Sequence, residues 1–239
     1  MFDRSGTKLA AQNLIKTAKP SPIYAGLMCI ALSIVVSFLS SRLNNAFTLD
    51  EMNRYMQYAL EGRVEQAWSM LESHTPSLSA QLINLALQIV TDIVGVGFII
   101  FLFNTIRRTG ACFGNLLDSF GIAGRIILLY ILELIFIVLW SLLLIIPGFI
   151  AAYRYRMAIY LLIDHPELSP MDCIRESKRM MAGHKAELFL LDFSFIGWEL
   201  LACLPYLGYL VRIWTVPYID MTLAMYYEWL CGRPYGFTQ

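Results

Sequence analysis

Long apolar runs constrain this chain more than any other feature. A bilayer core about 30 Å thick is crossed by roughly 20 residues of α-helix, and four runs reach that length while two more are shorter or interrupted by charges. The six runs span residues 22–41, 80–103, 126–146, 149–163, 187–206 and 209–230. The sequence therefore predicts an all-α fold, a polytopic transmembrane helical bundle of about six spans, with residues 1–239 forming a single membrane domain.

The composition agrees with this interpretation. Hydrophobic residues make up 58% of the chain and charged residues 15%, whereas soluble proteins carry about 25% charged residues. The formal net charge is zero, with 18 basic and 18 acidic residues. No overall field therefore points to nucleic acid as a partner, and membrane lipids are the partners that the composition predicts.

The run at 149–163 allows two topologies. It is either a separate span or the second half of one long helix over 126–163, kinked at Pro147. Cytoplasmic loops of membrane proteins carry an excess of Lys and Arg. Six spans place both termini and most of the 18 basic residues inside, and leave only Arg42, Arg54 and Arg63 outside. Five spans would put the basic stretch 175–185 outside, so six spans are favoured.

Residues 47–73 predict an amphipathic helix on the outer face. Thr48 and Glu51 have the spacing of a capping box, and apolar residues follow at intervals of mostly three and four. A bend is expected at Gly62. One interpretation is a lid over a cavity, and the favoured alternative is a connector that rests in the lipid headgroups.

Residues 169–185 predict a basic amphipathic helix on the cytoplasmic surface. Ser169 is its expected cap and Pro170 its first helical residue. Arg175, Lys178 and Arg179 are candidate lipid-surface residues, because each cation near anionic headgroups contributes about 1 kcal/mol. Equally, these three residues can serve only to enforce the topology.

Several short motifs stand in the C-terminal part of the chain. They are Ile146-Pro147-Gly148, Tyr155 with Met157-Ala158, Asp164-His165-Pro166, Ser177-Lys178 with Met181, Phe189 to Leu191, Ser194-Phe195-Ile196-Gly197-Trp198, and Pro217-Tyr218 with Thr222 and Tyr226-Tyr227. In these motifs the chain resembles the bacterial domain-of-unknown-function 975 family of polytopic membrane proteins. It is also distantly similar to the membrane-anchor regions of some glycerophosphodiester phosphodiesterases. The resemblance implies a location in the bacterial inner membrane and implies no particular activity.

No motif for catalysis, a metal or a cofactor stands out. The sequence has no nucleophile elbow, phosphate-binding glycine loop or His-Glu-x-x-His pattern. The five cysteines stand singly, without a CxxC pair or a histidine at ligand spacing. We therefore expect no metal and no cofactor, and the sequence favours a non-enzymatic protein over an enzyme.

Charges at membrane depth are the candidate ligand-binding residues. They are Glu133, Arg154, Arg156, Asp192, Glu199, Arg212 and Asp220. A charge at the centre of a membrane helix costs about 2.5 to 3.5 kcal/mol on insertion scales, so such residues usually face a partner charge, a bundle interior or water. The set predicts either a polar cavity for a charged or zwitterionic ligand or a group of structural ion pairs.

Arg154 and Arg156 point to nearly opposite sides of a helix, since two residues subtend about 200°. One of them is expected to face the carboxylates while the other extends elsewhere. Counted from the inner ends of the spans, Glu133 and Arg156 lie at similar depth, and Arg154 lies at the depth of Glu199 and Asp220. Arg154 is therefore the arginine expected to pair with these two acids.

These features support one leading hypothesis and two alternatives. The leading hypothesis is a non-enzymatic inner-membrane protein, transporter-like or export-related, whose polar interior accommodates a small amphiphile or a peptide. The first alternative is a membrane scaffold or adaptor that recruits lipids or proteins. An enzyme acting on lipid headgroups comes third. The sequence leaves the ligand and the oligomeric state open.

Overall fold

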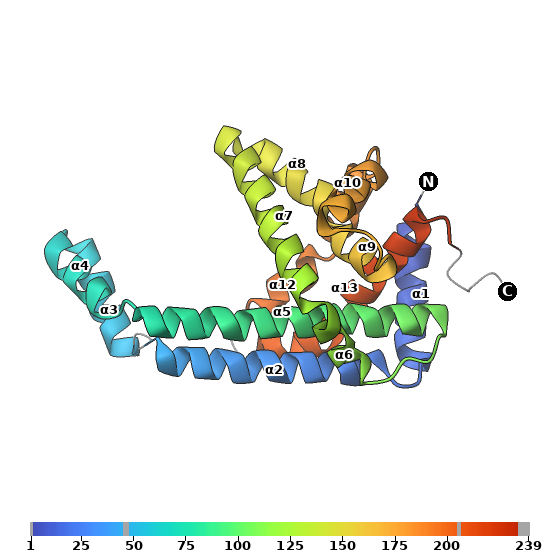
Figure 1. Ribbon diagram of the computed structural model, residues 1–239. Helices are drawn as coiled ribbons and strands as arrows, with labels where there is room; N and C mark the ends of the chain where they lie inside the picture. Colours follow the sequence, from blue (N-terminus) through green and yellow to red (C-terminus); the bar gives the residue numbers. More distant parts are fainter. Residues whose placement is uncertain (1, 45–47, 205–206, 234–239) are drawn as a thin grey trace. The chain divides into compact units, whose positions relative to one another are not determined.

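The computed structural model describes residues 2–44, 48–204 and 207–233, and within these ranges the chain is helical (Figure 1). By contacts it divides into a large unit, Met1–Ile30 with Ile93–Gln239, and a small unit, Ala31–Asp92. Two helices, α2 and α5, each run from one unit into the other. The prediction of a single membrane domain stays a prediction.

The elements follow one another in the chain with short connections. They are α1 Arg4–Thr17, α2 Pro22–Leu43, α3 Leu49–Leu60, α4 Val64–Ser73, α5 Leu78–Arg107, α6 Asn115–Asp118, the 3-10 helix η1 Ser119–Ile122, α7 Ala123–Leu143, α8 Ile145–Tyr155, α9 Ala158–Asp164, α10 Pro170–Met180, α11 Lys185–Phe193, α12 Ile196–Ala202 and α13 Leu207–Leu230. The all-α, membrane-type fold class is confirmed.

Among the residues that the structure describes, three helical segments are long and apolar enough to cross a bilayer: Pro22–Leu43, Leu78–Arg107 and Asn115–Leu143. They contain the predicted spans 22–41 and 80–103 and most of 126–146.

The other three predicted spans have a different form. Span 149–163 is divided between α8 and α9, span 187–206 is divided between α11 and α12, and span 209–230 lies in α13. Pro205 and Tyr206, at the end of span 187–206, lie outside the described residues. A total of six spans is not confirmed and stays a prediction.

The chain reverses at Leu144, where the backbone is extended, and α7 and α8 form an antiparallel hairpin (Figure 1). The alternative of one helix over 126–163 is therefore wrong. Pro147 does not cause the break, because it lies in the first turn of α8, where a helix tolerates a residue without an N–H. Gly148 lets the two helices approach closely, since a Cβ there would collide with Ser141.

In the small unit, the predicted amphipathic segment forms two helices, α3 and α4. The capping box is confirmed: the Glu51 N–H donates to Thr48 Oγ1 at 3.3 Å, and the Thr48 N–H donates to Glu51 Oε2 at 2.9 Å. The predicted bend is confirmed as a break, because Gly62 adopts a φ of +72°. Phe47, the first residue of the predicted segment, lies outside the described residues.

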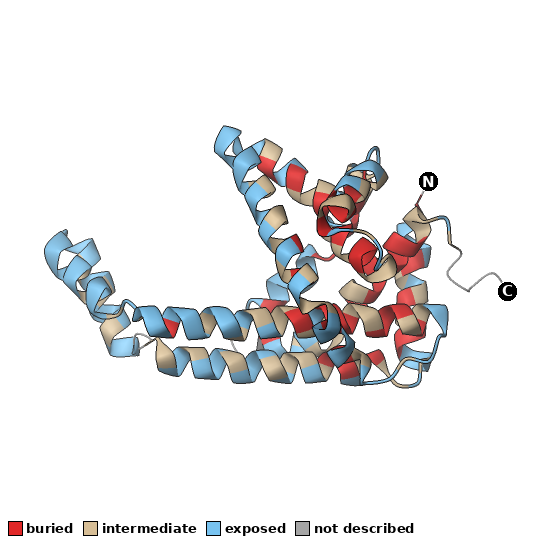
Figure 2. Cartoon of the chain, in the orientation of Figure 1, coloured by how far each residue is buried: buried red, intermediate tan, exposed pale blue. Residues whose placement is uncertain are grey.

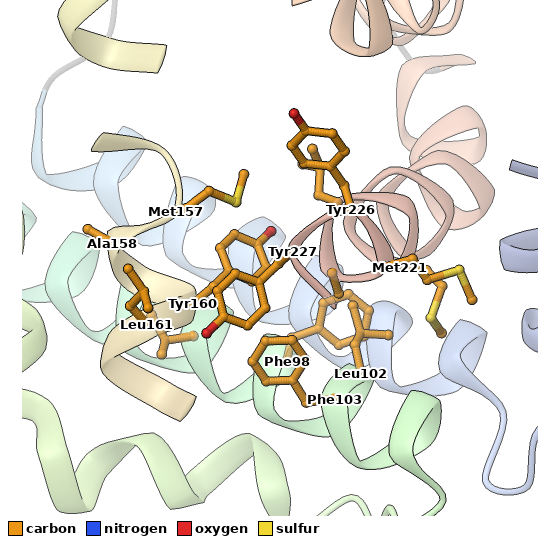
Figure 3. Packing of buried hydrophobic residues seen from close by; sticks show 14 of the residues in the cluster. Phe98, Leu102, Phe103, Met157, Ala158, Tyr160, Leu161, Met221, Tyr226 and Tyr227 are labelled. Atoms are coloured by element: carbon orange, nitrogen blue, oxygen red, sulfur yellow. The ribbon is translucent and has the colours of Figure 1, made fainter. Parts of the chain in front are cut away.

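The core of the large unit lies where α5, α9 and α13 meet (Figures 2 and 3). Phe103 of α5 and Tyr160 of α9 pack with Tyr227 of α13, and all three are at most 4% exposed. The rings of Tyr160 and Tyr227 stack with centroids 5.6 Å apart. These aromatic contacts hold α9 beside the C-terminal half of α5.

The polar N-terminal segment forms a helix that the sequence reading did not identify. Asp3 caps α1 by accepting the Gly6 N–H at 3.0 Å. Its buried residues Thr7, Ala11, Leu14 and Ile15 recur every three or four positions, which is the spacing of a helix that packs one face. That face contacts α13.

Candidate functional site

A turn at Arg156 and Met157 interrupts the helical path between α8 and α9. The buried Ser177 of α10 bridges it: its Oγ accepts the Met157 N–H at 3.2 Å and donates to the Arg154 carbonyl oxygen at 2.8 Å. Buried backbone groups need such partners, because an unpaired N–H or C=O away from water costs about 1 to 3 kcal/mol. The hydroxyl of Ser177 therefore permits a break that the local sequence, which has no glycine or proline there, does not encode.

A cavity of about 310 Å³ opens beside this break. Its walls come from α5, α7, α8, α9 and α13. The polar side chains that line it are Tyr130, Glu133, Tyr155, Arg156, Tyr160 and Asp220. The rest of the wall is aliphatic, so the cavity offers a few charged groups in an apolar surround.

Acidic groups surround the single arginine of the cavity. Arg156 interacts electrostatically with Glu133 and Asp220 in the wall, and with Asp192 of α11, which also contacts Tyr153. None of these carboxylates lies within 4 Å of the guanidinium, as judged over residues 2–44, 48–204 and 207–233. The charges therefore face one another across space that a ligand group can occupy.

Packing behind the cavity holds two of its tyrosines in place. Tyr160 contacts Tyr227 and also Phe103, at a centroid distance of 5.9 Å. The ring centroid of Tyr155 lies 5.9 Å from that of Phe136. Their positions are thus set by α5, α7 and α13.

The remaining predicted charges lie elsewhere. The guanidinium of Arg154 lies 5.7 Å from the centre of the Trp140 ring, and no ion pair of Arg154 occurs in the part of the chain that the structure describes. Its expected pairing with Glu199 and Asp220 is therefore wrong. The physical reason is the turn at 156–157, which directs the second arginine, instead of the first, toward Asp220. Glu199 is exposed and adds negative charge near Asp220, and Arg212 is exposed.

A second polar cluster, which we call the ion cluster, joins Arg107, Asp164, Glu228, Arg233 and Tyr227. Arg107 Nη1 lies 2.7 Å from Asp164 Oδ1, and Arg107 Nη2 lies 2.5 Å from Glu228 Oε1. Arg233 Nη1 lies 2.7 Å from Asp164 Oδ2. The Tyr227 hydroxyl donates to Asp164 Oδ2 at 2.9 Å. The side chains of Asp164 and Glu228 are only 6% and 3% exposed. The cluster ties the C-terminal ends of α5, α9 and α13 to one another.

The electrostatics of Asp164 show how strongly this cluster is paired. Burial by itself raises the pKa of the carboxyl group, but hydrogen bonds from Arg107, Arg233 and Tyr227 outweigh it. The pKa of Asp164 therefore lies below its ordinary value.

The sequence reading missed this cluster. In the sequence, Arg107 and Arg233 contribute only to the excess of basic residues on the predicted cytoplasmic side. Glu228 lies near the end of the apolar run 209–230. One feature of the sequence pointed to the cluster: Arg107, Asp164 and Glu228 each lie at the predicted cytoplasmic end of an apolar helix. That signal identifies the depth of each residue, but it does not reveal which helices are neighbours.

The basic residues of α10 lie on its exposed face. Ser169 caps the helix as predicted, accepting the Asp172 N–H at 3.2 Å. Arg175 pairs with Asp172 at 3.0 Å, and Arg179 pairs with Glu176 at 2.8 Å. Neighbouring acids thus offset part of the positive charge that lipid headgroups would meet.

Comparison with known proteins identifies one family. The family described as "Protein of unknown function (DUF975)" matches residues 1–233 of the chain. No curated protein and no solved structure matches it. The predicted family resemblance is confirmed over nearly the whole chain, whereas the resemblance to glycerophosphodiester phosphodiesterase anchors stays a prediction. In the described ranges, no three His, Cys, Asp or Glu side chains form a group that could hold a metal ion.

Proposed function

Because the chain belongs to the domain-of-unknown-function 975 family, whose description assigns no activity, we propose a function from the cavity alone. The protein binds a small zwitterionic amphiphile or a short apolar peptide within the membrane and passes it across in a transporter-like or export-related way. The observation that supports this proposal is the cavity of about 310 Å³ in which Arg156 faces Glu133 and Asp220 without a direct ion pair.

The charges of the cavity match the two ends of such a ligand. A carboxylate or phosphate of the ligand would bind Arg156, and an ammonium group would bind between Glu133 and Asp220. The aliphatic wall, which includes Ile99 and Leu223, would receive the apolar part. A ligand that carries both charges would place a negative group beside Arg156 and a positive group beside the two carboxylates, so that each charged side chain of the cavity has an opposite charge next to it.

Interrupted helices support the transporter-like part of the proposal. Transporters commonly form their ligand sites where membrane helices are broken, because the free ends of the half-helices can rearrange around a ligand. Here α8 and α9 are interrupted at Arg156, α11 and α12 at Ser194, and α13 contains Pro217. The interrupted path of α8 and α9 contributes directly to the cavity wall, as does the proline-containing α13.

Binding of a defined zwitterion tests the proposal. The full chain in lipid nanodiscs is titrated with the dipeptide Leu-Leu in an isothermal calorimeter, and with the same dipeptide acetylated and amidated so that it has no charges. We expect binding of the zwitterion, and a loss of about a hundredfold or more for the neutral analogue, since it lacks both charges and each charge-assisted hydrogen bond is worth about 1.5 to 3 kcal/mol.

Two arginines two positions apart provide a matched control. Arg156→Ala should abolish the binding, whereas Arg154→Ala should leave it unchanged, because Arg154 is not part of the cavity wall. Uptake of radiolabelled Leu-Leu into proteoliposomes then separates transport from binding alone. Equal binding by the two alanine variants would contradict the proposed site.

We place the protein in the bacterial inner membrane with both termini cytoplasmic. The support is the distribution of Lys and Arg along the sequence, which six spans concentrate on one side. Lys178 and Ser69 are both exposed, so cysteines introduced there can be labelled. A membrane-impermeant maleimide should label Ser69→Cys in intact cells and should not label Lys178→Cys. The reverse pattern would exclude this topology.

The scaffold hypothesis is favoured by a different observation, the apolar surface of α3 and α4. Leu60 is 85% exposed and Val64 73% exposed. Contiguous exposed apolar side chains of this kind are typical of interaction surfaces. If replacement of both residues by Ser abolishes a cellular phenotype that Arg156→Ala leaves intact, the scaffold is the better account.

A further inference from the structure

Two adjacent arginines at the end of α5 have different environments. Arg107 is engaged by Asp164 and Glu228 in the ion cluster. Arg108 has no carboxylate within 4 Å among the described residues, and its backbone is left-handed, with φ at +56°. This conformation is uncommon for a residue other than glycine. Arg108 lines a pocket that Arg107 does not line.

The pocket has a volume of about 390 Å³ and lies between the C-terminal end of α1 and the C-terminal end of α5. Its two charged lining residues are Lys19 and Arg108, and no Asp or Glu lines it. Like Arg108, Lys19 forms no ion pair within 4 Å in the ranges that the structure describes. The pocket therefore carries two positive charges without a counter-charge from the protein.

A hydrogen-bond donor completes the pocket. The Asn104 side chain lines it, and the amide oxygen of Asn104 accepts the Thr109 hydroxyl at 2.8 Å. This bond leaves the Nδ2 group of Asn104 as the available donor. Two cations and an amide N–H₂ make a set that suits the oxygens of a phosphate group.

The place of these residues in the chain points to the membrane surface. Lys19 precedes the candidate span Pro22–Leu43 by three residues, and Arg108 directly follows the candidate span Leu78–Arg107. Residues that flank membrane spans lie at the depth of the lipid headgroups. The apolar part of the pocket wall, Leu14, Ala18 and Ala111, would adjoin the glycerol and upper acyl chain of a lipid.

We propose that Lys19, Arg108 and Asn104 form a phosphate-binding site at the headgroup level of the membrane, separate from the Arg156 cavity. The ligand is a phosphate group, either of an anionic phospholipid or of a small soluble phosphate. The proposal does not depend on what the Arg156 cavity binds.

Native mass spectrometry of the full chain tests the site. The protein is purified in detergent with added phosphatidylglycerol, and the fraction that retains a lipid is measured. Wild-type protein should retain it, and Lys19→Ala should raise the lipid concentration needed for half-maximal retention about tenfold, which is the effect of one charge-assisted bond on the dissociation constant. Lys16→Ala is the matched control, because Lys16 is an exposed cation of α1 that does not line the pocket.

Arg108→Gly removes the guanidinium and keeps the backbone conformation, because glycine adopts positive φ without strain. This variant should be at least as stable as the wild type and should lose lipid retention like Lys19→Ala. Loss of binding in a stable protein separates the proposal from a folding defect.

A second arm distinguishes the two sources of phosphate. If sn-glycerol 3-phosphate alone raises the melting temperature of wild-type protein, and does not raise that of Arg108→Gly, the ligand is a soluble phosphate. If only phosphatidylglycerol has this effect, the ligand is a lipid. If Lys19→Ala and Arg108→Gly bind both probes as tightly as Lys16→Ala does, the proposed site does not exist.

Discussion

The Arg156 cavity and the ion cluster contain the same types of side chain, arginine, carboxylate and tyrosine, in opposite arrangements. In the ion cluster the oppositely charged atoms are 2.5 to 2.7 Å apart in the closest pairs, and the acids are nearly fully buried. In the cavity no carboxylate is within 4 Å of Arg156 among the described residues, and Arg156 is exposed to the open space.

The difference separates a structural role from a binding role. Charges in direct contact satisfy one another, and removing one of them leaves a buried charge without compensation. Charges held apart across a cavity remain available to a ligand, and their cost is tolerated because water or a ligand can enter. The presence of charged residues among apolar helices therefore does not by itself separate the two arrangements in this protein. The distances between the charges separate them.

The largest effect is expected for Arg107→Ala. It leaves Asp164 and Glu228 buried without their main partner, and breaking a buried ion pair costs about 3 to 5 kcal/mol. The free energy of unfolding in mixed micelles, measured by titration with SDS, should fall by about this amount. Adding Glu228→Gln should restore part of the loss, because one stranded negative charge is then gone. Arg108→Gly serves as the control at the neighbouring position.

A smaller effect is expected for Ser177→Ala. The substitution leaves the Met157 N–H and the Arg154 carbonyl without their bridge, and an unsatisfied buried polar group costs about 1 to 3 kcal/mol. Stability should fall within that range, and Leu-Leu binding should weaken because the turn that presents Arg156 is no longer held. Lys178→Ala, on the exposed side of the same helix, should change neither property. Unchanged binding in Ser177→Ala would show that the bridge does not position the cavity.

The pH dependence of stability should come from the ion cluster. Because the folded-state pKa of Asp164 lies below its unfolded value of about 3.9, its contribution is present above that value and is lost as the pH falls through the folded pKa. The difference in unfolding free energy between wild type and Asp164→Asn should thus be constant from pH 7 to 5 and shrink below about pH 4. A difference that persists at pH 2 would mean that the carboxylate charge is not what stabilises the cluster.

The smallest effect on stability is expected for Arg156→Ala. The side chain is exposed and makes no close ion pair, so after screening its interactions are worth about 0 to 1 kcal/mol. The SDS titration should therefore place Arg156→Ala near the wild type although its dipeptide binding is lost. A loss of stability as large as that of Arg107→Ala would remove the distinction between the two regions and make the cavity charges structural.

The sequence predicted those features that depend on residues close together in the chain. The capping box of Thr48 and Glu51, the break at Gly62 and the Ser169 cap of α10 are all found where their spacing predicted them. The candidate spans followed from apolar runs for the same reason, because burial in lipid depends on the composition of each segment. The family resemblance, stated for the C-terminal part, extends over residues 1–233.

The choice between Arg154 and Arg156 could not be predicted. Helical spacing correctly indicates that the two side chains diverge, but the direction of each depends on the turn at 156–157, which Ser177 of another helix stabilises. Depth along a predicted span also assumes an unbroken helix. That assumption fails where α8 ends, so matching the depth of Arg154 to Glu199 and Asp220 selected the wrong arginine.

The sequence by itself determined that the chain is a helical membrane protein, where its most apolar segments lie, and which charged residues stand within those segments. These properties depend only on residues that are close together in the chain, so composition and local spacing are enough to predict them. The tertiary structure alone decided which charges meet. Arg107 and Glu228 are 121 positions apart in the chain, and Arg156 and Asp220 belong to different helices, so their distances follow from how the helices pack. Charge pairing falls off with distance, and the same residue types therefore form a closed cluster in one place and an open cavity in the other.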